Sequence, residues 1–265
     1  RELRRSTVLS PHQTIEKVDL EMVESLLDDG GSFAKLMQGF EKRDEQISMA
    51  RAVTDAINEG KRLIVEAGTG VGKSLAYLLS AALYAMANNC RVVVSTNTLN
   101  LQEQLLNKDL PELLEVLKEA GFAGVKDFRF SLLKGRVNYL CLKRWLHLAG
   151  GDRISDDEAR LLSKILVWLR STGTGDRSEL NLANRHAAMS WDRISAQGAR
   201  DCIGVNGVCF LRGARERAAA SHLLVVNHAL LMSDIMADRA LIPEHDILIV
   251  DEAHHLEEEA TRHMG

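Results

Sequence analysis

The sequence predicts an α/β protein in which helices cover both faces of a parallel β-sheet. Four short apolar runs, at residues 62–67, 91–95, 222–227 and 246–250, have the continuous hydrophobicity of strands that are buried on both faces. Helical stretches separate these runs, which is the alternation that a parallel sheet requires. The chain also has only three prolines and 5% aromatic residues, a composition that favours a helix-rich α/β protein over a sandwich or a barrel.

The elements before the first strand are predicted to be helical. Residues 1–38 form a leader in which apolar side chains recur at roughly helical spacing, until Gly30 and Gly31 end the pattern. A helix is expected from about residue 44 to 58, with Gly60 after its end.

The rest of the chain alternates strands and helices, with one interruption. Helices are predicted at 73–88 and 99–120, each after a strand. From about 131 to 217 the alternation is lost, because this segment is helical only in patches, has a polar stretch at 171–178 and holds three of the four cysteines. The predicted division is therefore a helical leader at 1–38, a first part of the α/β domain at 39–130, an insertion at 131–217 and a second part of the domain at 218–265.

Charge and hydropathy narrow the class of protein. The net charge is −4, so contact with nucleic acid requires a local basic patch. No run of about 18 apolar residues is present, and residues 1–6 lack the apolar core of a signal peptide. These observations predict a cytoplasmic protein without membrane contact, in which the cysteines stay reduced.

The strongest chemical signal is a glycine-rich segment between a predicted strand and a predicted helix, Ala67-Gly68-Thr69-Gly70-Val71-Gly72-Lys73-Ser74. Its small residues let successive backbone N–H groups surround a diphosphate at the positive end of the helix dipole. Lys73 would reach the β- and γ-phosphates, and the Ser74 hydroxyl would ligate Mg²⁺. An ordinary glycine-rich turn is the alternative, but such a turn does not need Gly-Lys-Ser at its end. The segment predicts a nucleotide site with Mg²⁺.

A pair of acids, Asp251 and Glu252, directly follows the apolar run 246–250. Ligands of parallel sheets collect at the carboxyl ends of the strands. Asp251 would hold the Mg²⁺ through its water shell, and Glu252 would orient and deprotonate an attacking water. Alone, such a pair is more often a solvated strand end or a helix cap. Beside a phosphate loop, the catalytic interpretation is favoured for Lys73, Asp251 and Glu252.

The two motifs together resemble those of superfamily 2 helicases, in which an alanine at position 67 is usual. Residues 95–105, 133–141 and 225–231 are similar to further motifs of the DinG/XPD group of iron–sulfur helicases, and the whole pattern resembles bacterial DinG-type proteins. The resemblance implies the first RecA-like motor domain of an ATP-dependent DNA helicase that moves 5′→3′ on single-stranded DNA in replication and repair. A nucleotide-dependent binding switch or scaffold without unwinding activity is the alternative.

The resemblance also sets an expectation for the activity of the chain by itself. In that group an arch domain, a second motor domain and an arginine finger follow the acidic pair, and this chain ends at Gly265. We therefore expect weak or absent ATPase activity from the chain alone. The sequence does not establish an oligomeric state, and a monomer is favoured.

The segment 40–46 resembles the adenine-reading element of the same group. A glutamine amide can both donate to and accept from the adenine edge, so the resemblance assigns Gln46, together with Arg43, to ATP binding. Taken alone, Gln46 would be a solvated helix residue.

Three cysteines, Cys141, Cys202 and Cys209, lie in the insertion next to basic residues, whereas Cys90 is predicted to be a small buried side chain before a strand. By resemblance these three would bind a [4Fe–4S] cluster, which needs four thiolates. The group has a further cysteine between the positions of Cys202 and Cys209, and this sequence has none there. The absence of this fourth cysteine has several explanations: a loop missing from the sequence, a non-cysteine ligand, a lost cluster or an altered chain. Three free thiols or a zinc site are the alternatives.

Two sets of residues are candidates for contact with single-stranded DNA. By resemblance, the segment 95–100 lies where helicases of this type hold a nucleic-acid backbone, although its hydroxyls also suit a helix N-cap. In and around the insertion, cations would follow phosphates and rings would stack on bases, the alternative being helices with snorkelling cations and core aromatics. This second set comprises Phe128, Arg129, Phe130, Lys134, Arg136, Tyr139, Lys143, Arg144, Trp145, Arg212, Arg215 and Arg217.

Overall fold

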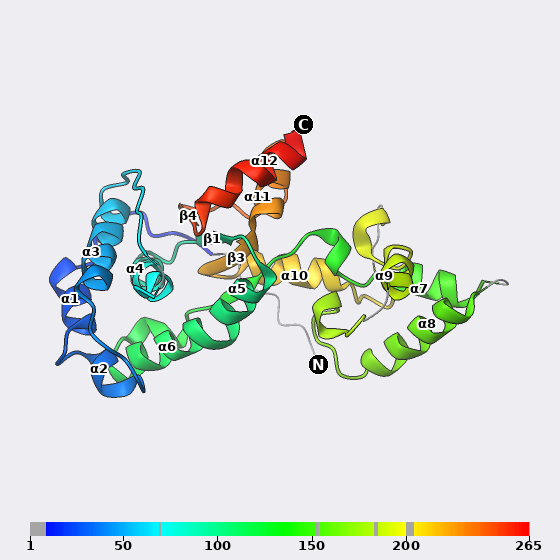
Figure 1. The fold of residues 1–265 in the computed structure, drawn as a ribbon, viewed down its shortest axis with the longest axis horizontal. Helices are drawn as coiled ribbons and strands as arrows, with labels where there is room; N and C mark the ends of the chain where they lie inside the picture. The colour runs from blue at the N-terminus through cyan, green and yellow to red at the C-terminus, as the bar shows by residue number, and fades with distance from the viewer. Residues whose placement is uncertain (1–8, 69, 152–153, 183–184, 200–203, 265) are drawn as a thin grey trace. The chain divides into compact units, whose positions relative to one another are not determined.

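The computed structural model of the chain describes residues 9–68, 70–151, 154–182, 185–199 and 204–264. It divides into two compact units (Figure 1). The first unit is formed by Arg1–Leu132 and Ala218–Gly265, and the second by Leu133–Arg217.

A parallel sheet of four strands, in the order β2-β3-β1-β4, forms the centre of the first unit. Val94 is level with Val225 on one side and with Ile249 on the other. The predicted strands 91–95, 222–227 and 246–250 are confirmed, whereas β2 was not predicted because three residues are too few to show a pattern. The strands are β1 (Val92–Thr96), β2 (Phe130–Leu132), β3 (Leu223–Asn227) and β4 (Ile247–Val250).

Side chains cover both faces of the central strands. Val92 and Val94 belong to one hydrophobic cluster with helix α4 (Lys73–Asn88). Because strand side chains alternate between the two faces, the fully buried Val93 lies on the other face. Helix α11 (His228–Met236) contacts both β1 and β3. The predicted class, an α/β protein with a parallel sheet, is confirmed. The predicted burial holds for β1 and β3, whereas β4 is only partly buried and its Leu248 is 43% exposed.

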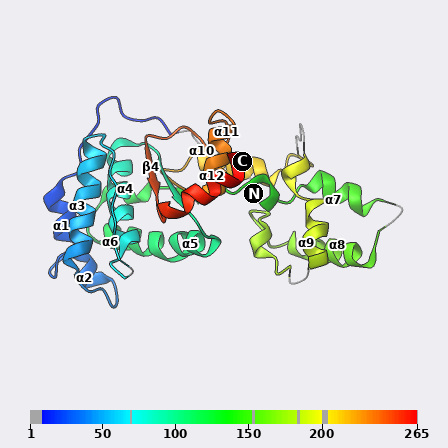
Figure 2. The ribbon, with the colours of Figure 1, turned by 45° about the horizontal axis from the view of Figure 1, so that its top comes forward.

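Helices pack around this sheet in the first unit, with α3 against α4 and α4 against α6 (Figure 2). The stretch predicted as one helix at 99–120 is a continuous run of α5, a π-helical turn and α6. Within the described residues, no helix has the length and apolarity needed to cross a membrane. These elements are α1 (Leu20–Leu27), α2 (Ser32–Leu36), α3 (Asp44–Asn58), α5 (Leu99–Gln104), η1 (Leu105–Asp109), α6 (Leu110–Glu119), η2 (Ala123–Lys126), η6 (Ala253–His255) and α12 (Leu256–Met264).

The leader is attached to the first unit partly by two asparagines. Asn58, at the end of α3, exchanges two hydrogen bonds with the backbone of Val18, at 2.8 and 2.7 Å. Asn88, at the end of α4, does the same with Glu16, at 2.7 and 2.9 Å. The prediction of a helical leader holds only for α1 and α2, because residues 9–19 are not helical.

The predicted strand at 62–67 is wrong, and this changes how the phosphate loop is held. Residues 61–68 have no regular secondary structure, and the side chain of Ile64 is 98% exposed. Continuous apolarity signals a buried strand only where a neighbouring strand is available. Here β4 pairs with β1 alone, so the run 62–67 has no strand partner among the described residues.

The second unit is mainly helical and has its own core around the fully buried Trp191 and Ile165. Helix α8 begins with a capping box, in which Ser155 and Glu158 satisfy each other's backbone N–H groups. The elements are η3 (Arg136–Asn138), α7 (Leu142–Ala149), α8 (Asp156–Trp168), η4 (Arg177–Glu179), α9 (Arg185–Asp192), η5 (Ala196–Gly198) and α10 (Phe210–Ala219), whose last two residues belong to the first unit.

Candidate nucleotide site

Two glycines shape the phosphate loop. Gly70 and Gly72 have φ of 85° and 82°, in the left-handed region that glycine adopts without strain. Gly72 is the N-cap of α4, so Lys73 begins the helix. A Cβ at Gly72 would lie 2.0 Å from the Gln46 amide nitrogen, so a larger residue would displace the Gln46 side chain and strain the left-handed backbone. Of the eight predicted loop residues, Thr69 lies outside the described part of the chain.

Arg43 and Gln46 both hold the loop from outside. The buried Gln46 side chain donates a hydrogen bond of 2.9 Å to the carbonyl of Gly72, and the Arg43 guanidinium donates to the carbonyl of Gly70. The structure therefore places these two residues against the phosphate loop. Recognition of adenine by Gln46 and Arg43 stays a prediction.

The acidic pair lies at the carboxyl end of β4, as expected for Asp251 and Glu252. The Asp251 N–H donates to the carbonyl of Ser95 on β1, at 2.8 Å. The Glu252 N–H donates to Asp251 Oδ1, at 2.9 Å. Glu252 itself has φ of 54° and ψ of 44°, a left-handed conformation that costs a non-glycine residue about 1 kcal/mol. This conformation helps to set the direction of the Glu252 side chain.

Side chains from α4 join the two motifs. The Lys73 ammonium forms an ion pair with Glu252 Oε1, at 3.2 Å. The Tyr77 hydroxyl donates to Asp251 Oδ2, at 3.0 Å. Burial, the Asp251 charge and the hydrogen bond to Asp251 together raise the pKa of Tyr77 well above its usual value, against the opposing effect of Ser74.

This arrangement suits the oxygen chemistry of Mg²⁺. The two predicted ligands, Ser74 and Asp251, offer a hydroxyl and a carboxylate, and both are neighbours of Tyr77. Ser74 lies three residues before it on α4, and Asp251 accepts its hydrogen bond. Hard oxygen donors of this kind are what Mg²⁺ prefers. The sequence interpretation missed Tyr77, although its place four residues after Lys73 puts it on the same side of α4.

A second network lies beneath the acidic pair. The buried Ser95 hydroxyl and His228 Nδ1 are 2.7 Å apart, and burial lowers the pKa of His228. Ser95 and Thr96 are both fully buried, so their side chains are not available to a nucleic-acid backbone as predicted. Thr98 caps α5 by accepting a hydrogen bond from the Leu101 N–H at 3.2 Å, which is the N-cap alternative.

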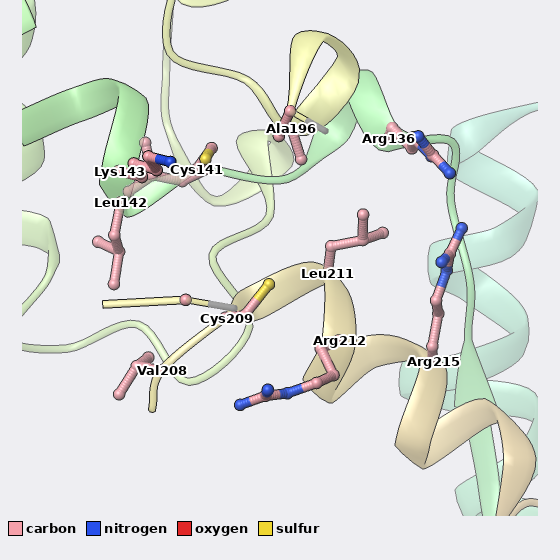
Figure 3. A pocket seen from close by; sticks show the side chains of 13 residues that line it. Arg136, Cys141, Leu142, Lys143, Ala196, Val208, Cys209, Leu211, Arg212 and Arg215 are labelled. Carbon is pink, nitrogen blue, oxygen red and sulfur yellow. The ribbon is translucent and has the colours of Figure 1, made fainter. Parts of the chain in front are cut away.

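The cysteines separate between the two units. Cys90 is buried in the first unit, and burial, reinforced by Asp246, raises its pKa to about 12. In the second unit, Cys141 and Cys209 line one cavity of about 460 Å³. Figure 3 shows their side chains among those of four cations that line the same cavity, Arg136, Lys143, Arg212 and Arg215. Cys202 lies outside the described residues.

These residues do not supply a complete ligand set for a [4Fe–4S] cluster. The unit has three cysteines where a cubane needs four, and Cys90 belongs to the core of the other unit. Among the described residues, no group of three or more His, Cys, Asp or Glu side chains is arranged to hold a metal ion. The positive lining of the cavity is nevertheless suited to an anion.

Two residues of the predicted DNA-binding set have structural roles in the second unit. Lys134 is buried in an ion pair with Asp176, at 2.7 Å, and also donates to Ser178, at 3.0 Å. The buried Tyr139 hydroxyl accepts the Lys134 N–H at 3.0 Å. The interpretation of Lys134 and Tyr139 as contacts for single-stranded DNA is therefore wrong, because their polar groups form hydrogen bonds and an ion pair inside the unit.

Comparison with known proteins agrees with this geometry. Residues 48–124 match the DEAD/DEAH box helicase family. The ATP-dependent helicase DinG of Mycobacterium tuberculosis is 40% identical over 245 residues, which cover 84% of this chain and 36% of that protein. The ATP-dependent DNA helicase YoaA of Escherichia coli is 37% identical over 248 residues, 89% of this chain and 36% of that protein. The 3′-5′ exonuclease DinG of Bacillus subtilis is 34% identical over 236 residues, 88% of this chain and 24% of that protein.

The parallel sheet, the phosphate loop and the acidic pair, together with the family match, define a DEAD/DEAH box helicase domain. The chain spans about a third or less of the length of the three relatives. It belongs to the DinG-type helicases and holds the N-terminal portion of such a protein.

Proposed function

We propose that this chain supplies the nucleotide site of a cytoplasmic ATP-dependent DNA helicase that moves 5′→3′ along single-stranded DNA. The observation that carries the proposal is the joining of the two motifs, through the Lys73–Glu252 ion pair of 3.2 Å and the Tyr77–Asp251 hydrogen bond of 3.0 Å. The relatives are named as ATP-dependent helicases, which supports the choice of activity.

The chemistry at the site follows from these residues. Backbone N–H groups at the start of α4 would bind the phosphates of ATP at the positive end of the helix. Ser74 and Asp251 would hold Mg²⁺, which neutralises charge on the phosphate oxygens. Lys73 would leave Glu252 to bind the β- and γ-phosphates, and the freed Glu252 carboxylate would accept a proton from the attacking water. The same opening of the ion pair thus prepares both residues.

Nucleotide titration of the chain tests this site. We expect Lys73→Ala to weaken ATP binding at least tenfold, since its charge is directed at the phosphates. Lys61→Ala is the matched control, because Lys61 lies in the same region of the chain and pairs only loosely with Asp55, at 3.5 Å. Equal affinities of the two variants would contradict the proposed site.

The cavity of the second unit is the proposed contact for single-stranded DNA. The guanidinium groups of Arg136 and Arg215 point toward one another (Figure 3), and burial followed by the charge of Arg136 lowers the pKa of Arg215. Two cations held this close favour an anion between them, such as a backbone phosphate.

The DNA contact is tested by fluorescence anisotropy with a labelled oligothymidine. Arg215→Ala should weaken binding and reduce the slope of log affinity against log salt by about one. Arg160→Ala, at an exposed position of α8 in the same unit, should change neither. An unchanged salt slope in Arg215→Ala would remove Arg215 from the binding surface.

The iron–sulfur cluster stays a prediction from the resemblance. An anaerobic iron count and absorbance spectrum test it directly. About four irons per chain with a visible absorption band would support a cluster with one ligand other than these three cysteines. An iron-free protein that binds single-stranded DNA would show that the unit works without one.

A further inference from the structure

Tyr77 contacts one of the two ligands proposed for Mg²⁺, Asp251. It lies on α4, three residues after Ser74, and its side chain is buried. Its hydroxyl donates to Asp251 Oδ2, at 3.0 Å. A phenol has one proton to donate, and Tyr77 gives it to the Asp251 carboxylate.

The fold makes the Tyr77–Asp251 hydrogen bond important for holding the phosphate loop beside β4. Because residues 62–67 are not paired in the sheet, no strand hydrogen bonds fix the phosphate loop beside β4. The Lys73–Glu252 ion pair joins them, but its side chains are 29% and 33% exposed, and Lys73 has to leave when phosphates bind. The Tyr77–Asp251 bond is not used by the nucleotide, so it can persist through binding.

The same bond fixes the rotation of the Asp251 carboxylate. Oδ1 accepts the Glu252 N–H at 2.9 Å and Oδ2 accepts the Tyr77 hydroxyl at 3.0 Å. Both oxygens are therefore oriented before any metal arrives. Outer hydrogen-bond partners of this kind set the affinity of metal sites, and their loss typically costs 10–100-fold.

We propose that Tyr77 is a positioning residue that holds the Asp251 carboxylate in the orientation required for the Mg²⁺ of a bound nucleotide. It sets the affinity for Mg²⁺ and not the affinity for the nucleotide itself. This inference rests on the nucleotide site proposed above.

The test uses the full chain and a fluorescent ADP analogue, titrated with and without Mg²⁺. Tyr77→Phe removes only the hydroxyl. We expect its metal-free affinity to stay within about twofold of the wild type, and its half-saturating Mg²⁺ concentration to rise about tenfold or more. High Mg²⁺ should restore full binding, which a general loss of structure would not allow.

Tyr84→Phe is the matched control. Tyr84 is buried on the same helix, about 10 Å further along the axis from Tyr77, and should leave the Mg²⁺ dependence unchanged. Circular dichroism of both variants establishes that each is folded.

A double mutant shows whether Tyr77 acts through Asp251. In an Asp251→Asn background, Tyr77→Phe should have little further effect on the Mg²⁺ dependence, because the carboxylate that it orients is gone. Additive effects, an unchanged Mg²⁺ requirement in Tyr77→Phe, or an equal loss of metal-free binding would each overturn the proposal. Failure of the wild type to bind the nucleotide would instead contradict the proposed function.

Discussion

The ion pair between Lys73 and Glu252 predicts that Glu252, the proposed catalytic base, competes with the nucleotide for the lysine. In the structure Lys73 Nζ and Glu252 Oε1 are 3.2 Å apart, so phosphate binding by Lys73 requires this pair to open. Glu252→Gln keeps the size of the side chain but removes its charge. We therefore expect the variant to bind nucleotide more tightly than the wild type while losing the base proposed for hydrolysis.

The size of this effect follows from the separation and the exposure of the two charges. At 3.2 Å, Coulomb's law in a medium as polar as water gives about 1 kcal/mol. Both side chains are about a third exposed, and pairs that solvent reaches contribute about 0–1 kcal/mol when measured. An upper value of about 1 kcal/mol corresponds to about a fivefold gain in affinity, so a gain of about two- to fivefold is expected.

Titration with ADP and with AMP separates this competition from a general effect of charge. AMP lacks the phosphates that Lys73 is expected to bind, so Glu252→Gln should gain affinity for ADP but not for AMP. Glu258→Gln is the control for the loss of one negative charge, because Glu258 pairs with Arg262 on α12. Equal gains for both nucleotides, an equal gain in Glu258→Gln, or weaker ADP binding would refute the reasoning.

Three further predictions concern the rest of the chain. His222 accepts the Arg129 N–H at 3.1 Å, and burial lowers its pKa to about 4, against about 6.5 in the unfolded chain. The free energy of unfolding should therefore have its full value above pH 6.5 and fall by up to about 3 kcal/mol toward pH 4. Urea unfolding measured across this pH range should show the fall in the wild type and lose it in His222→Gln. Iodoacetamide at pH 8 should modify Cys209 but leave Cys90, whose pKa is about 12, unmodified until the chain unfolds, as mass spectrometry would show. Ile64→Ser should change the free energy of unfolding by no more than about 0.5 kcal/mol, because this side chain is 98% exposed; a larger loss in urea unfolding would mean that the run 62–67 is packed.

The sequence was sufficient where the signal is local. The positive φ of Gly70 and Gly72 is a requirement of the loop's own backbone, and it is visible as glycine at fixed spacing before Lys73. The acidic pair follows directly from a strand, so its place at the end of β4 could be predicted. Three strands could be predicted because each is a continuous apolar run, although only β1 and β3 are buried and Leu248 of β4 is 43% exposed.

The tertiary structure decided everything that depends on a distant partner. The run 62–67 is as apolar as the true strands, and only the absence of a neighbour in the described sheet leaves it exposed. In the sequence Lys134 is indistinguishable from a DNA-binding cation, and only the structure shows its ion pair with Asp176. Tyr77 meets Asp251 across 174 residues.

One physical reason separates the features that the sequence predicted from those that only the tertiary structure showed. A backbone turn or an apolar run is a property of a few consecutive residues, so the sequence alone placed the phosphate loop, the acidic pair and three strands. Burial, ion pairing and the donor of a hydrogen bond depend on which surfaces meet after folding. Only the folded chain could therefore show that Lys73 is held by Glu252 and that Asp251 is held by Tyr77.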